Sequence, residues 1–458
     1  MPLRWEMLQR YFPVHQNEKN KLPPIKEAEM AVIEKRATLT GNEAVAWAMK
    51  LARVQVGVHF PIGPADEVME TVRIRIDAGD MPNTRIIQAE NEKAVVSCQI
   101  GLARMGIRSL FATCTEGLLW PAAEIRYAVG SRLPIMIAIP SRSIEPPTTV
   151  YPDHEDFIMM RDMGWLMFYC EDSQDILDTI IQAYKISENR SIMLPAFVGY
   201  DGWEVSHGKS RITLPDQEKV DSFLPPYPMR LEGDYASIDW YERCRSRRLG
   251  GARSGDEPQG RRFGDEHSME MKYFQVKALE DAASVIEEVG REYQELFGSN
   301  HVGSLETDGC EDAEIILITM GVLAPLVRVT ANAYRENGIK VGSVKLRVFR
   351  PFPERALCQV VKNAKLVIVV ERNCRNAVYT ELKSALYTHF IAEKRSEAPP
   401  MVMGKLAGLG GRWVSPEDIA QIIEEGLGAL KAGKIEKSME WVGLRDVSFD
   451  PLRDSVVD

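Results

Sequence analysis

A group of acids and an arginine stand where strands of an expected sheet end, and open α/β sheets place ligand-binding side chains at such ends. Glu90-Asn91-Glu92 lies at a strand-to-helix junction, and Arg142 follows an apolar strand that ends at Pro140. The planar guanidinium of Arg142 could bind a substrate carboxylate or form a salt bridge within its loop. The acids would also stabilise a helix N-terminus electrostatically, and by position alone this structural role is favoured for Glu92.

Two further groups have the composition of ligand sites, but ordinary structure explains each of them better. Asp153-His154-Glu155-Asp156 contains side chains of a metal or acid–base site, yet such a run is more typical of a turn and helix start. Gly408-Leu409-Gly410-Gly411 precedes a helix whose N-terminus could hold phosphate, although a structural turn is favoured. The sequence contains no P-loop, no G-x-S-x-G and no H-E-x-x-H motif.

The seven cysteines are scattered and form no C-x-x-C pair. This count predicts no disulfide framework and indicates a reducing compartment, so we expect a cytoplasmic protein. The spacing also argues against an iron–sulfur cluster or a structural zinc site within this chain, and the histidine spacing offers no metal site.

The composition is that of an ordinary globular protein. The chain has 458 residues, of which 45% are hydrophobic and 27% charged, and its net charge is -10. This length allows roughly two to four domains. An acidic balance argues against nucleic-acid binding, and no apolar run reaches the roughly 18 residues that span a membrane. The first residues lack the order of a signal peptide.

Strands and helices alternate in the first half of the chain, as they must to position these residues. Near-continuous apolar strands between helices predict a parallel sheet with helices on both faces. The expected strands are Gly57–Phe60, Arg85–Ala89, Ser109–Thr113, Pro134–Ile139 and Ser191–Val198. The expected helices are Glu43–Ala52, Glu90–Met105, Gly117–Val129 and Ser173–Ser187. Thr40 or Asn42 can cap the first of these helices.

A second α/β unit follows the long helix that we expect over Lys272–Phe297. Its expected strands are Glu314–Met320, Lys340–Val348 and Lys365–Glu371, and its helices are Leu323–Asn337, Pro353–Lys362 and Pro416–Leu430. Ser415, Pro416 and Asp418 form a clear start for the last helix.

The predicted domain boundaries follow from these patterns. We expect an N-terminal extension over 1–39 with some helix over Ile25–Arg36, a first domain over 40–222, a linker over 223–271, a second domain over 272–436 and a tail over 437–458. The linker contains Arg243–Arg253, with five arginines and no acid. A solvated insert is favoured over an anion or partner site for this stretch.

Ten ordered motifs between residues 40 and 430 resemble one family, the alpha subunits of the thiamine-dependent 2-oxoacid:ferredoxin oxidoreductases. The motifs are Thr40-Gly41-Asn42-Glu43-Ala44-Val45-Ala46, Phe60-Pro61-Ile62-Gly63-Pro64, Glu90-Asn91-Glu92, Glu116-Gly117-Leu118, Leu133-Pro134-Ile135, Asp153-His154, Arg161-Asp162-Met163-Gly164-Trp165, Phe223-Leu224-Pro225-Pro226-Tyr227, Leu346-Arg347-Val348-Phe349-Arg350-Pro351-Phe352-Pro353 and Ala407-Gly408-Leu409-Gly410-Gly411-Arg412.

The resemblance implies a pyrimidine-binding α/β domain followed by a transketolase C-terminal-like α/β domain. It implies thiamine diphosphate shared with a beta subunit, Mg²⁺ and [4Fe-4S] clusters in partner subunits, and coenzyme A as co-substrate. Gamma and ferredoxin-like delta subunits would complete the complex, and ferredoxin or a NAD-reducing subunit would accept the electrons. The implied reaction is oxidative decarboxylation of a 2-oxo acid, in which the cofactor does the hard chemistry.

The resemblance also assigns residues. Glu92 matches the acid that hydrogen-bonds the N1′ atom of the aminopyrimidine, which makes a functional role favoured over the helix-start role. Arg142 matches the arginine that holds the substrate carboxylate, and Pro61 and Ile62 belong to the cofactor-binding turn. Asp153 and His154 match family positions (listed above as one motif), and for these we expect a subunit contact near the site.

This sequence departs from the family where the substrate would lie. Gly63 stands where pyruvate enzymes usually carry threonine, so a hydroxyl and side-chain volume are missing. Glu116 stands where glutamine is commoner, and Ile144-Glu145-Pro146-Pro147 is an unusual continuation after Arg142. Trp120 could flank an aromatic ring, although a core or interface role is favoured. We therefore predict a 2-oxo acid larger than pyruvate, such as phenylglyoxylate.

There are three alternatives, of which the third is the weakest. The chain could belong to a pyruvate or branched-chain 2-oxoacid oxidoreductase with an altered turn, or it could be a non-catalytic scaffold paralogue. The presence of both Glu92 and Arg142 argues against a scaffold. A freestanding transketolase-like enzyme would need a Gly-Asp-Gly segment with a downstream asparagine, and the sequence has no such segment.

Overall fold

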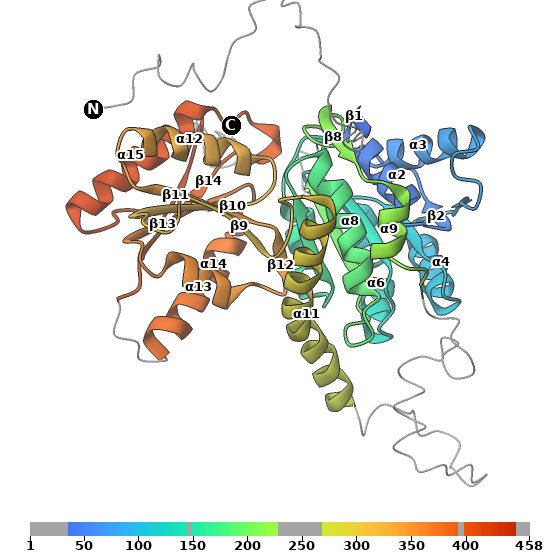
Figure 1. Ribbon diagram of the computed structural model, residues 1–458. Helices are drawn as coiled ribbons and strands as arrows, with labels where there is room; N and C mark the ends of the chain where they lie inside the picture. Colours follow the sequence, from blue (N-terminus) through green and yellow to red (C-terminus); the bar gives the residue numbers. More distant parts are fainter. Residues whose placement is uncertain (1–34, 145–148, 228–267, 393–397, 446–458) are drawn as a thin grey trace, which may run out of the picture.

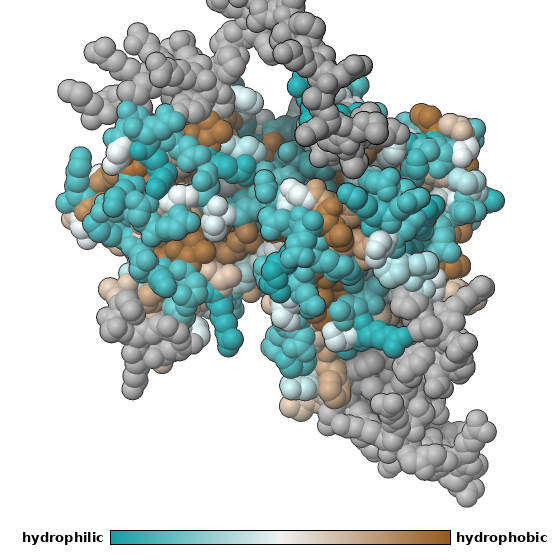
Figure 2. Space-filling view, in the orientation of Figure 1, coloured by the Kyte–Doolittle hydropathy of each residue, from teal (hydrophilic) through white to brown (hydrophobic). Residues whose placement is uncertain are grey.

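The computed structural model describes residues 35–144, 149–227, 268–392 and 398–445, which form two α/β units side by side (Figure 1). Residues 145–147 of the unusual continuation after Arg142, the Arg243–Arg253 stretch and most of the N-terminal extension and C-terminal tail lie outside the described residues. Figure 2 shows that the described part of one face is mostly hydrophilic, with hydrophobic residues in patches. No helix of the described residues is long and apolar enough to cross a membrane.

The first unit is built on a seven-stranded sheet with the strand order β12-β6-β7-β5-β4-β2-β3. All neighbouring strands are parallel except β12, which is antiparallel to β6. The strands are β2 (Val56–His59), β3 (Arg85–Gln88), β4 (Ser109–Ala112), β5 (Met136–Ser141), β6 (Leu166–Cys170), β7 (Ala196–Asp201) and β12 (Val348–Arg350). Strands β4 to β7 are buried throughout, as expected for apolar strands covered on both faces.

Helices cover this sheet, and local signals fix where several of them begin. Of the two predicted caps, Thr40 is the N-cap of α2, and it forms a capping box with Glu43. The single helix expected over Gly117–Val129 is instead two helices, because Pro121 lacks a backbone N–H and separates them. The helices are α2 (Gly41–Leu51), α3 (Asp66–Asp77), α4 (Glu92–Arg104), α5 (Glu116–Leu119), α6 (Ala122–Gly130), α7 (Glu155–Met159), α8 (Ser173–Ser187) and α9 (Gln217–Phe223).

The predicted extension differs from the structure at its end. Strand β1 (Lys35–Leu39) pairs antiparallel with β8 (Ser210–Leu214), so the first unit begins before residue 40. The last two residues of the helix expected over Ile25–Arg36 therefore belong to a strand. Leu39 and Ile212 bury their side chains there, which gives the small sheet a hydrophobic face.

The second unit contains a six-stranded sheet with the order β15-β14-β13-β10-β11-β9, parallel except for the β9–β11 pair. Its strands are β9 (Leu305–Asp308), β10 (Ile315–Thr319), β11 (Val341–Leu346), β13 (Leu366–Glu371), β14 (Met401–Leu406) and β15 (Met439–Trp441). Its helices are α12 (Leu323–Glu336), α13 (Glu354–Val361), α14 (Ala377–Leu386) and α15 (Pro416–Ala432). Ser415 and Asp418 cap α15 as predicted. Strand β15 places the start of the expected tail inside the sheet.

The two units exchange elements, so the predicted division at residue 272 differs from the packing. Helix α11 (Ser268–Phe297) packs against α8 of the first unit, and its Tyr293 ring contacts Phe223. Strand β12 also crosses from the second half to the edge of the first sheet. Hydrophobic burial decides this arrangement, because Ala282, Ile286 and Val289 of α11 join the core of the first unit.

A buried ionic group joins the two units. Asp201, at the end of β7, accepts a 2.9 Å hydrogen bond from Arg372 of the second unit and lies 3.0 Å from Nε2 of His154. The other carboxylate oxygen of Asp201 accepts the backbone N–H of Val322. Arg372 also bonds Glu204, so this buried arginine has two anionic partners. Such pairs tolerate burial only when their hydrogen bonds are satisfied.

Candidate functional site

Four segments that follow neighbouring parallel strands meet at one edge of the first sheet. They are the turn Phe60–Pro64 after β2, Glu90–Glu92 after β3, Thr113–Gly117 after β4 and Arg142 after β5. Because β3, β2, β4 and β5 are adjacent and parallel, their carboxyl ends lie at the same edge. This is the edge at which open α/β sheets hold ligands.

The buried side-chain amide of Asn42 holds the turn after β2. Asn42 donates a 2.8 Å hydrogen bond to the carbonyl of Pro64 and accepts one of 2.8 Å from the hydroxyl of Tyr200. Pro61 is exposed and Ile62 is half-buried. A Cβ atom built on Gly63 would meet nothing within 4 Å. The missing side chain at Gly63 therefore leaves open space.

Glu92 is buried at the start of α4 but does not cap the helix. Asn91 is the cap, because its side chain accepts the N–H of Ala94 at 3.0 Å. The Glu92 side chain is only 3% exposed, and its Oε2 atom has no hydrogen-bond partner among the described residues. A Cβ atom on Gly117 would lie 3.1 Å from Oε1 of Glu92, so glycine is needed for this approach. A buried carboxylate with one oxygen that lacks a hydrogen-bond partner is typical of a ligand site.

Arg142 is held by Thr115 and Glu116. Its guanidinium donates to Oγ1 of Thr115 at 3.1 and 3.3 Å and lies 3.4 Å from Oε2 of Glu116. The Thr115 hydroxyl in turn donates to Glu116. Burial acts to raise the pKa of Glu116, but the hydrogen bond from Thr115 and the charge of Arg142 outweigh it, so the pKa is lowered. The site thus carries a cation and an anion side by side.

Asp156, which the sequence analysis interpreted as part of a turn, binds the segments that follow β4 and β5. One of its carboxylate oxygens accepts the backbone N–H groups of Thr115 at 3.1 Å and Arg142 at 3.2 Å. Burial raises the pKa of Asp156 to about 6, although these N–H groups act in the opposite direction. Thr115 has a φ of 43°, which is rare for a β-branched residue and needs support from its surroundings.

The structure separates the roles of Asp153 and His154. Asp153 is buried near Ser143, whose hydroxyl lies 3.4 Å away, just past Arg142. His154 is 2% exposed and contacts Asp201 and the ring of Tyr169 within this chain. The packing of the two units buries the His154 side chain within this chain.

The segment Thr113–Gly117 contacts Gly63, Arg142 and Glu92. Cys114 donates a weak 3.6 Å hydrogen bond to the carbonyl of Gly63, Thr115 and Glu116 contact Arg142, and Gly117 admits Glu92. Sequence reasoning missed the importance of Cys114 and Thr115. Their position after a buried strand was the available signal, because the same rule selected Glu92 and Arg142.

Trp120 and the glycine-rich segment were also predicted as candidates. Trp120 is 59% exposed at the end of α5. The glycine-rich segment Gly408–Gly411 forms a turn, in which the N–H of Gly411 bonds the carbonyl of Pro152. Acids with metal-ligand spacing occur around His301, but the Lys345 ammonium lies 2.8 Å from Asp175 and already supplies a cation there.

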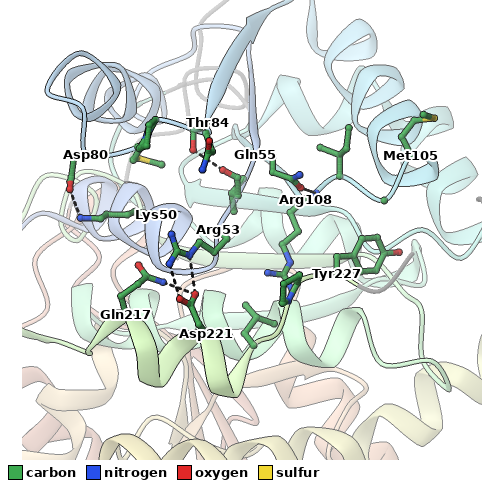
Figure 3. Close-up of a pocket in the computed structure, with 18 residues that line it drawn as sticks. Lys50, Arg53, Gln55, Asp80, Thr84, Met105, Arg108, Gln217, Asp221 and Tyr227 are labelled. Atoms are coloured by element: carbon green, nitrogen blue, oxygen red, sulfur yellow. Dashed lines mark hydrogen bonds and ion pairs between the residues drawn. The ribbon is translucent and has the colours of Figure 1, made fainter. Parts of the chain in front are cut away.

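A hollow of about 1010 Å³ opens at the opposite edge of the first sheet (Figure 3). It is lined by residues that precede β2, β3 and β4, including Gln55, Thr84 and Arg108. Its charged groups pair with one another, as the Arg53–Asp221 ion pair illustrates. Because its lining residues precede the strands, whereas Glu92 and Arg142 follow theirs, the hollow lies away from Glu92 and Arg142.

Comparisons with known proteins show the family to which this chain belongs. A family model described as pyruvate flavodoxin/ferredoxin oxidoreductase, thiamine diP-bdg, matches residues 47–291. A second, described as pyruvate:ferredoxin oxidoreductase core domain II, matches residues 313–419. The predicted α/β class with a thiamine diphosphate-binding first domain is thus confirmed.

Curated relatives cover nearly the whole chain. Pyruvate synthase subunit PorA of Pyrococcus furiosus is 35% identical over 414 residues, which are 90% of this chain and 98% of that protein. Ketoisovalerate oxidoreductase subunit VorA of Pyrococcus horikoshii is 32% identical over 425 residues, again 90% of this chain and 98% of that protein.

A solved structure shares the fold. The 2-oxoglutarate:ferredoxin oxidoreductase from Magnetococcus marinus, with 2-oxoglutarate, coenzyme A and succinyl-CoA bound, has a TM-score of 0.62 and 19% identity. The match covers 89% of this chain and 68% of that one. Together with the family matches and the curated relatives, this places the chain among the alpha subunits of the 2-oxoacid:ferredoxin oxidoreductases.

Proposed function

We propose that this chain is the catalytic alpha subunit of a complex that converts a 2-oxo acid larger than pyruvate, such as phenylglyoxylate, and coenzyme A to acyl-CoA and CO2. Two electrons pass to iron–sulfur clusters in partner subunits. The observation that carries the proposal is Glu92, a buried carboxylate with an unpartnered oxygen at the ligand-binding edge of the sheet.

The residues at this edge fit the aminopyrimidine end of thiamine diphosphate. Glu92 would hold the pyrimidine N1′ atom with its unpartnered oxygen, and the turn at Pro61 and Ile62 would line the ring. When bound, the cofactor would supply a thiazolium ring, whose carbon adds to the 2-oxo group and whose positive charge accepts the electron pair left by CO2. We assign the diphosphate, Mg²⁺ and the [4Fe-4S] clusters to beta, gamma and delta partner subunits.

Arg142 would anchor the substrate carboxylate. Its guanidinium is partly exposed, and Thr115 and the backbone bond to Asp156 fix its position. A planar guanidinium suits a carboxylate because both can form two parallel hydrogen bonds. Fixing the carboxylate also orients the neighbouring 2-oxo carbon.

Gly63 supports a larger substrate. The space that a Cβ atom would enter is open, so a branched or aromatic side chain gains room beside the turn. A site without the hydroxyl also holds a small polar substrate less well. A pyruvate or branched-chain type is the alternative, and the PorA and VorA relatives favour it.

Replacing Glu92 with glutamine tests the catalytic assignment. The assay is coenzyme A-dependent viologen reduction by the intact complex, tagged on this chain. We expect turnover to fall at least about 100-fold, because the amide cannot replace the carboxylate in proton transfer. Exposed Glu90 offers a matched control, and Glu90→Gln should retain activity. Full activity of the Glu92→Gln complex would instead favour a scaffold role.

Replacing Gly63 with threonine tests the substrate assignment. A panel of pyruvate, 2-oxoisovalerate, phenylglyoxylate and indolepyruvate would be ordered by kcat/KM in both complexes. We expect the unmodified complex to prefer an aromatic acid, and Gly63→Thr to shift the preference toward pyruvate by about 10-fold or more. A preference of the unmodified complex for pyruvate or 2-oxoisovalerate would establish the alternative type.

A further inference from the structure

The carboxylate of Glu116 lies beside the guanidinium of Arg142, to which the substrate carboxylate would also bind. Its Oε2 atom lies 3.4 Å from the guanidinium, close to the separation of an ion pair. The Thr115 hydroxyl joins the two side chains, since it accepts from Arg142 and donates to Glu116. The positive charge of Arg142 is thus already balanced before any substrate binds.

Thr115, which contacts Glu116, is fixed by its surroundings, while the Glu116 side chain is 57% exposed. Thr115 is fully buried and its backbone N–H is bound by Asp156, so the hydroxyl that holds Glu116 cannot move freely. The pKa of Glu116 is lowered, which leaves the side chain ionised at neutral pH. A bound 2-oxo acid would therefore share the guanidinium with a fixed negative charge.

We propose that Glu116 is a positioning residue that acts through Arg142, opposing the substrate carboxylate before decarboxylation and balancing Arg142 afterwards. This inference rests on the proposed role of Arg142. During the step the bond between C1 and C2 of the substrate breaks, C1 leaves as neutral CO2, and the electron pair of that bond would pass to the thiazolium ring of the bound cofactor. The carboxylate loses its charge, so its competition with Glu116 for the guanidinium of Arg142 disappears on the way to the transition state.

The test is the Glu116→Gln variant of the intact complex, which removes the charge and keeps the shape. We expect the dissociation constant of the preferred 2-oxo acid to fall by about fivefold, the upper end for an exposed pair. The single-turnover rate of CO2 release should fall by a similar factor. This joint decrease is the signature of lost ground-state strain, which a merely structural role does not produce.

A neutral probe separates charge from shape. The amide of the same 2-oxo acid should inhibit the original and Glu116→Gln complexes equally, because it carries no carboxylate charge. Tighter binding of the amide, weaker binding of the acid, or tighter binding of the acid with an unchanged rate of CO2 release would each overturn the proposal.

Arg142→Gln distinguishes this inference from the proposed function. We expect Arg142→Gln to weaken binding of the acid, and the effect of Glu116→Gln to vanish in the Arg142→Gln background. If Arg142→Gln leaves binding unchanged, the carboxylate anchor itself is wrong. If Arg142→Gln weakens binding but Glu116→Gln retains its effect in that background, only the role of Glu116 fails. Thermal unfolding and subunit content of each complex verify its assembly.

Discussion

Asp153 and Asp156 are two buried carboxyl groups close to Arg142 in the sequence and the fold. Both lower the stability of the folded state at neutral pH. Burial raises the pKa of each to about 6 from an ordinary value of 3.8, and Glu155 adds to the shift of Asp153. The folded state therefore holds these protons more tightly than the unfolded state. Stability contributed by these groups falls as pH rises from about 4 to about 6 and stays lower above pH 6.

Asp153→Asn should raise the free energy of unfolding at pH 8 by about 1–3 kcal/mol. The amide oxygen can still accept the Glu155 N–H, and the amide NH2 can donate to the Ser143 hydroxyl. Urea unfolding at pH 4 and pH 8 measures the effect. The gain should be confined to the higher pH, and a variant that is less stable at pH 8 would contradict the prediction.

Individual site residues could be predicted where they follow a strand directly, because open α/β sheets place ligand-binding groups at the carboxyl ends of their strands. The sequence identifies Glu92 and Arg142 as candidates in this way, and the structure places them after β3 and β5, at the same edge of one sheet with β2 and β4 between them. Asp156 was not predictable, because its role depends on Thr115 and Arg142, which are 41 and 14 residues away. A run of acids reads locally as a turn and does not reveal which backbone groups will be brought to it.

At the scale of elements, the end of β4 and the short helix α5 are packed more tightly than their sequence indicates. A Cβ atom on Gly117 would lie 2.0 Å from Oγ1 of Thr113 and 3.1 Å from Oε1 of Glu92. The end of β4 and the start of α5 can pack this closely only because position 117 is glycine. This packing brings the start of α5 against the carboxylate of Glu92.

Gly117→Ala should displace Glu92 or Thr113, and we expect a loss of activity of about 10-fold or more together with lower stability. Gly101→Ala is the matched control, because Gly101 lies in α4 with nothing within 4 Å of an added Cβ. This control should stabilise the helix by about 0.5–1 kcal/mol. Equal activity and thermal stability of the two variants would show that the junction tolerates the methyl group.

Most regular elements followed from periodicity and caps, but their partners did not. Strand β12 has only three residues and directly follows β11, so the sequence reads as one continuous strand over Lys340–Val348. Helix α11 was expected, but its apolar residues do not say which sheet they cover. Tertiary packing against Phe223 and α8 decides this.

The molecule as a whole depends on ionic contacts between its units. Arg372 is 2% exposed between Asp201 and Glu204, and Asp201 also serves His154 and Val322. Removing one partner of a buried pair costs more than the pair contributes, since the other charge stays buried. The ends of β7 and β13 are thus tied to each other.

Arg372→Ala should lower the free energy of unfolding by about 3–5 kcal/mol. Because the lost contacts lie between the units, urea unfolding followed by tryptophan fluorescence should also separate into two transitions. Arg53→Ala removes an exposed pair with Asp221 and should cost at most about 1 kcal/mol. A single transition with a loss as small as that of Arg53→Ala would contradict this prediction.

The exchange of α11 and β12 between the two halves has a consequence for how the gene could be divided. A cut anywhere between residues 227 and 268 would leave both elements on the downstream polypeptide, although their contacts lie on the upstream one. The upstream fragment would expose the face of α8 and the edge of β6 that these elements cover. Two polypeptides encoded in this way would have to be synthesised together and recognise each other, as the two parts of a fragment-complementation pair do.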